Sequence, residues 1–278
     1  MSGSLMNRKL VRGVVFSLSA LALAGAALAQ SKDLPKAEEI IEKYIEATGG
    51  RAAYEKIKNR VTRATIEIPA QGLKGNITLT EGPPNLQRVV MNIEGIGKIE
   101  NGFDGQVAYE TSQMRGPRLM EGDEKAAAAR QSVFNLALHL KDVYPSIKVI
   151  GEEVLDKRPT LKLELTPKDG KPEYWYFDKE TGLHMRMDMK AMTQMGELDS
   201  QSMMSEYRRV DGLMLPHQTN QKISTLEQII RVESVAHNTE LPKDAFDAPK
   251  DVKELVAKGS ATRPAQSKPA ESQPARKP

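Results

Sequence analysis

The 278-residue chain contains no cysteine, and this absence excludes several kinds of site at once. Disulfide bonds, thiolate zinc sites, cysteine nucleophiles and c-type haem attachment all require cysteine. Without disulfides, a stable domain must be held together by its hydrophobic core. Residues 30–249, about 220 in all, are numerous enough to form one core of substantial size.

The chain also lacks a real excess of positive charge. Its formal charge of +3 comes from Arg8, Lys9 and Arg12, without which 37 basic and 37 acidic residues remain. The last 29 residues hold seven basic and three acidic residues, so the middle of the chain is slightly acidic. This balance does not favour a nucleic acid as partner.

Recognisable catalytic motifs are missing as well. The four histidines, His139, His184, His217 and His237, form neither an H-E-x-x-H motif nor a close pair with metal-binding spacing. The chain has no G-x-S-x-G motif and no glycine-rich loop of the kind that cradles phosphates. The sequence therefore predicts a protein that is not an enzyme, with no catalytic residues, metal or cofactor. A hydrolase whose site is not visible in sequence spacing is kept as an alternative.

The first 29 residues have the pattern of a secretory signal peptide. Three basic residues precede an apolar run over residues 14–26, and Ala27-Leu28-Ala29 is an A-x-A cleavage site. The apolar run is shorter than the roughly 20 residues of a membrane-spanning helix, which argues against a retained anchor. Because Gln30 rather than cysteine follows the cleavage site, we expect a periplasmic protein that is not lipidated there.

Hydrophobic periodicity predicts a mainly β domain of the α+β class over residues 30–249. Residues 36–48 form an amphipathic helix pattern, which Gly49-Gly50 ends. About eleven segments of alternating polarity then follow, separated by glycine-rich turns, as in an antiparallel meander. Residues 122–144 interrupt them with a helical, apolar pattern that Pro145 ends. A sheet of this size curls, so we predict an open half-barrel with an N-terminal helix and an inserted helical lid.

The last segment, residues 250–278, has few large apolar residues. Its final part repeats a Pro-Ala-x-Ser unit with interspersed basic residues. Such a composition cannot bury enough surface to fold, so we predict a disordered tail rich in proline, alanine and lysine.

Several phrases of the sequence resemble a family of exported bacterial proteins. These phrases occupy residues 43–50, 102–105, 116–119, 176–183 and 206–216. The family is similar to the outer-membrane lipoprotein-sorting carriers with the LolA/LolB-like fold. The resemblance covers residues 38–249 and implies an open half-barrel with a helical lid and a hydrophobic cavity for acyl chains. The basic, proline-rich tail is not part of the carrier pattern.

Methionines gather in the second half of the chain. Met185, Met187 and Met189 alternate with charged residues, so their thioethers share one face of a strand. Flexible methionine side chains suit a cavity for varied acyl chains, but they fill ordinary cores equally well. Thioethers also bind copper(I), although no histidine or cysteine cluster accompanies them here.

Together these observations predict a monomeric carrier that shields the acyl chains of a lipid or lipoprotein, with transient contact to a membrane surface. Alternation along the strands places the cavity side chains of the sheet on one face: Ile77, Leu79, Met91, Ile93, Leu163, Leu165, Met187 and Met189. The lid is expected to contribute Phe134 and Leu138. An envelope sensor that uses the same fold to contact a protein partner is the alternative.

Overall fold

The computed structural model describes residues 34–262 except Asp169, Gln194 and Met195. The predicted signal peptide, its cleavage site and residues 263–278 of the predicted tail lie outside the described residues. Among the described residues, no helix has both the length and the apolar character needed to cross a membrane.

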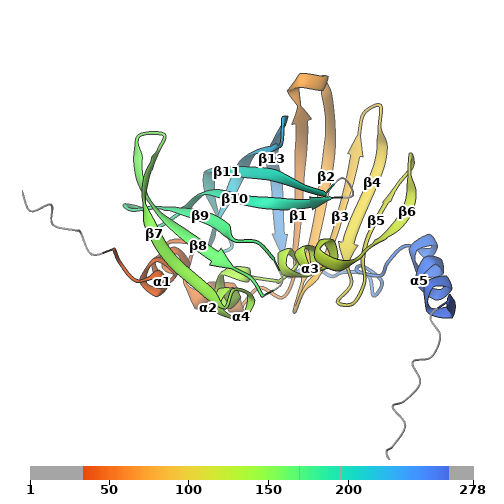
Figure 1. The fold of residues 1–278 in the computed structure, drawn as a ribbon, viewed down its shortest axis with the longest axis horizontal. Helices are drawn as coiled ribbons and strands as arrows, with labels where there is room; N and C mark the ends of the chain where they lie inside the picture. Colours follow the sequence, from red (N-terminus) through yellow and green to blue (C-terminus); the bar gives the residue numbers. More distant parts are fainter. Residues whose placement is uncertain (1–33, 169, 194–195, 263–278) are drawn as a thin grey trace, which may run out of the picture. The chain divides into compact units, whose positions relative to one another are not determined.

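The described residues form one antiparallel sheet of thirteen strands (Figure 1). The strands lie in the order β6-β5-β4-β3-β2-β1-β13-β12-β11-β10-β9-β8-β7, so β6 and β7 are the two edges. Their bounds are β1 Arg60–Ile68, β2 Leu73–Gly82, β3 Leu86–Ile93, β4 Gly97–Phe103, β5 Ala108–Ser112, β6 Gly116–Met120, β7 Ser146–Leu155, β8 Arg158–Thr166, β9 Glu173–Asp178, β10 His184–Thr193, β11 Gly196–Val210, β12 Leu213–Ile223 and β13 Leu226–His237.

The predicted fold class, a mainly β α+β fold built on an open antiparallel sheet, is confirmed. The number of strands differs, since the described residues form thirteen rather than about eleven. Strand β6 went unpredicted because it is only five residues long and contains Pro117. Proline lacks a backbone N–H and is tolerated at a sheet edge, where β6 lies.

Helix α1 (Ala37–Ala47) forms as its amphipathic pattern predicts, and it buries Ile40, Ile41 and Ile45 in the main core. Gly49 follows it with a φ of 128°, and a Cβ atom there would lie 2.4 Å from the carbonyl oxygen of Gly212. Only glycine allows this close approach between the helix end and the β11–β12 turn. The short helix α2 (Arg51–Glu55) comes next and adds Tyr54 to the same core.

The inserted segment is not the continuous helix over residues 122–144 that its pattern predicts. It divides into helix α3 (Gly122–Gln131), a 3-10 turn η2 (Leu136–His139) and helix α4 (Leu140–Val143). The break occurs at Asn135, which has a φ of 50° in the left-handed region. Its amide donates to the Tyr54 carbonyl at 3.0 Å and accepts from Arg60 Nη2 at 3.2 Å. These tertiary bonds compensate for the interrupted helix.

The prediction that the chain does not fold from Lys250 onward is wrong for residues 250–262, which form helix α5 (Lys250–Thr262). The large apolar residues of this helix recur at helical spacing, but Val252, Leu255 and Val256 are too few to predict a helix from the sequence. Val252 is 0% exposed and packs with Tyr109 and Ala248. Tyr109 pairs with Leu119 in β6, so α5 covers that edge of the sheet.

We expect Val252→Asp to lower the free energy of unfolding by about 2–4 kcal/mol, because it places a charge in this dry contact. Chemical denaturation monitored by circular dichroism measures the change. The matched control is Ala257→Asp on the exposed side of the same helix, expected to change the free energy by about 0.5 kcal/mol or less. Equal effects of the two substitutions would contradict the docking of α5.

Candidate functional site

The strand registers place all eight predicted cavity residues of the sheet on one face. Ile77 lies opposite Met91 in the β2–β3 pair, and Leu79 and Ile93 are two residues away from them along the same strands. In the other half of the sheet, Leu163 and Met187 both lie opposite Trp175. Nine of the ten predicted residues nevertheless fall into two groups with different surroundings, and Met189 lines a pocket described below.

The first group lies in the main core. Leu163, Leu165 and Phe134 are buried there, and Leu138 and Met187 pack against the same cluster. Helices α1 and α2 and the segment η2–α4 supply the other side of this core. We call the face that carries the predicted residues the inner face of the sheet. Side chains therefore fill this inner face at β7–β9.

The second group lies on strands β2 and β3, away from the main core. Ile77, Leu79 and Met91 are all partly exposed on this face, and Ile93 is buried. Val89 and Ile99 extend the apolar surface, since Val89 lies opposite Leu79 and Ile99 lies opposite Met91. This half of the inner face therefore offers apolar side chains that the helices of the main core do not cover.

A pocket of about 540 Å³ lies beside this surface, since its lining residue Asn101 is opposite Val89 in the β3–β4 pair. Strands β3–β6 line it on one side, strands β10–β12 on the other, and helix α3 contributes Ala127 and Ala128. Its apolar wall includes Met120, Met192 and the predicted Met189. Volumes of 300–1,000 Å³ are usual for small-molecule sites.

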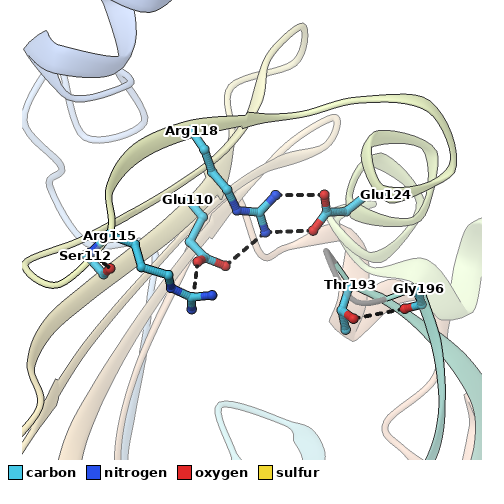
Figure 2. A network of polar contacts seen from close by, with 7 residues as sticks. All are labelled: Glu110, Ser112, Arg115, Arg118, Glu124, Thr193 and Gly196. Atoms are coloured by element: carbon cyan, nitrogen blue, oxygen red, sulfur yellow. Dashed lines mark hydrogen bonds and ion pairs between the residues drawn. The ribbon is translucent and has the colours of Figure 1, made fainter.

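Four charged residues form a network on the polar side of this pocket (Figure 2). The guanidinium of Arg118 donates two hydrogen bonds of 2.7 Å to Glu124 on α3 and one of 3.1 Å to Glu110 on β5. Arg115 Nη2 lies 3.4 Å from the other oxygen of Glu110. These carboxylates raise the pKa of Arg118, the Glu124 hydrogen bonds contributing most. The network ties the start of α3 to β5 and β6.

The end of α3 is tied to β9, the strand next to the β10 wall of the pocket. Arg130 Nε lies 3.3 Å from Glu173 on β9, and both side chains are almost fully buried. The second carboxylate oxygen of Glu173 accepts from Tyr144 at 2.9 Å and from Trp175 at 3.2 Å. Burial, followed by the adjacent Glu173 charge, raises the pKa of Tyr144. Helix α3 thus spans the pocket, with an ion-paired arginine contact near each end.

Neither ion-pair cluster was predicted from the sequence. Arg118 meets Glu110 only through the β5–β6 register, and β6 itself was not recognised. Arg130 and Glu173 are 43 positions apart and meet only in the folded chain. The one available signal was the placement of Glu124 in the first turn and Arg130 in the last turn of the helical pattern.

The chain matches no protein-family model and no curated protein. It does resemble solved structures. A DUF1329 family protein from Desulfovibrio piger is 15% identical with a TM-score of 0.52, over 76% of this chain and 96% of that one. A LolA superfamily protein from Nitrosomonas europaea is 14% identical with a TM-score of 0.53, over 77% and 99%.

A putative outer-membrane lipoprotein-sorting protein domain from Vibrio parahaemolyticus is 13% identical with a TM-score of 0.52, over 79% of this chain and 98% of that domain. At these identities the likeness concerns the fold. The resemblance to the lipoprotein-sorting carriers is confirmed at that level: the chain has a LolA-like fold.

Proposed function

We propose that the protein is an exported, non-enzymatic carrier that shields acyl chains of a lipid or lipoprotein. The observation that carries the proposal is the partly exposed apolar surface of Ile77, Leu79 and Met91, next to a methionine-lined pocket that α3 spans. Each CH₂ group transferred there from water gains about 0.8 kcal/mol. The LolA-like fold and the signal-peptide pattern of residues 1–29 support the same function in the periplasm.

The acyl chains would lie along β2 and β3 and reach Met189 in the pocket. Residues Leu163, Leu165, Phe134, Leu138 and Met187 belong to the main core. They would contact a ligand only after the inserted segment moved away. Release would require that the segment pack more favourably on the empty protein than on the loaded one.

The direct test is native mass spectrometry of the full chain, expressed in a Gram-negative host and purified without detergent, followed by lipid extraction. We expect near-stoichiometric lipid or acylated peptide to accompany the protein. A ligand-free mass, together with no uptake of a fluorescent fatty-acid probe, would overturn the proposal and direct the search to protein partners.

A matched pair of substitutions in β2 tests which face binds. We expect Ile77→Glu to weaken binding of the fluorescent fatty acid about tenfold or more, because it places a charge against the acyl chain. Thr78→Glu adds the same charge to the opposite face of the strand and should leave the affinity within about twofold. Fluorescence titration measures both, and equal losses would contradict binding on the inner face.

A further inference from the structure

We propose that the pocket that helix α3 spans binds the headgroup of a zwitterionic phospholipid, one that carries both a phosphate and an amine. The acyl chains would be directed toward β2. This inference rests on the proposed carrier function and goes further by naming the class of headgroup and the orientation of the ligand. It is carried by the polarity across the sheet, by the charge balance of the pocket and by unused donors on its arginines.

The inner face changes from charged to apolar across five adjacent strands. Along one cross-strand row the residues are Arg118, Glu110, Asn101, Val89 and Leu79, from β6 to β2. The next row contains Ser112, Ile99, Met91 and Ile77, from β5 to β2. An amphiphile on this face would place its polar end at β5–β6 and its chains at β2–β3. The reverse orientation would bury the charged headgroup, without partners, against the apolar side chains of β2–β3.

The charged groups that line the pocket balance one another. Among the described lining residues, Arg115 and Arg118 are cationic and Glu110 and Glu124 are anionic. A headgroup with one phosphate and one amine keeps this balance, whereas an anionic headgroup would leave a net negative charge in a partly desolvated site. Electrostatic complementarity of this kind determines specificity more than affinity.

The arginines retain hydrogen-bond donors for a phosphate. Arg118 Nε has no hydrogen-bond partner among the described residues, but it is buried, so a phosphate would reach it only after the side chain shifts. The Arg115 side chain is 65% exposed, and its contact with Glu110 is a single one of 3.4 Å. Guanidinium groups bind phosphate oxygens through such donors. The amine of the headgroup would then lie beside the carboxylates of Glu110 and Glu124, which face the same pocket.

The test compares lipids with identical acyl chains and different headgroups. Purified full-length protein is delipidated and exposed to equimolar phosphatidylethanolamine and phosphatidylglycerol vesicles, and the bound lipids are counted by mass spectrometry. For the unaltered protein we expect phosphatidylethanolamine to be bound about fivefold more. Glu110→Gln makes the pocket net positive and should shift the ratio toward phosphatidylglycerol, whereas Arg115→Gln should shift it further toward phosphatidylethanolamine.

Lys253→Gln on α5 removes a charge from a residue that does not line the pocket and should leave the ratio unchanged. Arg115 is largely exposed, so Arg115→Gln is expected to fold even if Glu110→Gln does not. Binding of both lipids with a ratio that neither pocket variant alters would overturn the headgroup assignment and leave the carrier function intact. Binding of neither lipid, with no uptake of the fatty-acid probe, would overturn the carrier function itself.

Discussion

Replacing Arg130 by methionine is expected to lower the free energy of unfolding by about 3–5 kcal/mol, the usual cost of leaving a buried charge without its partner. Arg130 is the cationic partner of Glu173 at the end of α3, where the two side chains are 10% and 5% exposed. Tyr144 and Trp175 would still donate hydrogen bonds to Glu173, but neither carries a positive charge. Urea denaturation near neutral pH measures the loss.

Two controls separate this charge effect from simple loss of packing. The double variant Arg130→Met with Glu173→Gln removes both charges and should recover most of the lost stability. Arg118→Met at the other end of α3 should cost less, about 1–2 kcal/mol, because its cluster is partly exposed to water. A loss below about 1 kcal/mol for Arg130→Met would show that Glu173 does not depend on this arginine.

The same variant probes the dynamics of α3. With the contact to β9 removed, α3 would keep its attachment to β6 through Arg118 and Glu124. We therefore expect the amides of α3 to exchange with solvent faster, while those of the central strands lose protection only as far as global stability falls.

The parts of the fold that were predictable depend on local patterns. Helix α1 follows from apolar residues at helical spacing and from Gly49 as its end, and most strands follow from alternation between turn residues. The errors occurred where distant contacts decide the structure. Helix α5 folds because Val252 packs with Tyr109, which is 143 positions away in the sequence. The inserted segment breaks at Asn135 because Tyr54 and Arg60 hold its side chain.

The candidate site shows the same division. Alternation was sufficient to place Ile77, Leu79 and Met91 on one face of the sheet, as the registers have them. Alternation could not distinguish which part of that face the helices fill, because this depends on where the inserted segment packs. The ion pairs of Arg118 and Arg130 could not be predicted for a related reason. Each requires a strand or a register that sequence spacing alone does not define.

A second large effect is expected from His184, which is buried against aromatic rings. Its imidazole stacks on Trp175 and Phe177, with ring centroids 4.7 Å and 5.0 Å away. Its Nε2 donates to the Arg186 carbonyl at 2.9 Å, so the neutral ring is already satisfied there. Burial lowers the pKa of His184 to about 3, from 6.5 in the unfolded chain. The folded protein therefore keeps this histidine neutral under mildly acidic conditions.

Because the folded pKa lies below the unfolded one, only the unfolded chain gains this proton between pH 6.5 and pH 3. The free energy of unfolding contributed by the neutral histidine is fully present well above pH 6.5. It falls as the pH drops below 6.5, by about 3 kcal/mol in all at pH 4.5. Paired carboxylates whose pKa is lowered, such as Glu100 and Asp178, lose their contribution only at lower pH. The effect of His184 within the interval from pH 6.5 to pH 4.5 is therefore identified by substituting His184 itself.

Urea denaturation at a series of pH values from 7.5 to 4.5 measures this slope. In His184→Phe the ring cannot be protonated, so the slope should largely disappear, although the lost hydrogen bond to Arg186 costs about 1 kcal/mol at every pH. His184→Gln offers a second uncharged side chain that can still donate to that carbonyl. The half-exposed His139 provides the control, since His139→Gln should leave the slope in place. A slope that survives both His184 variants would show that another group takes up the proton.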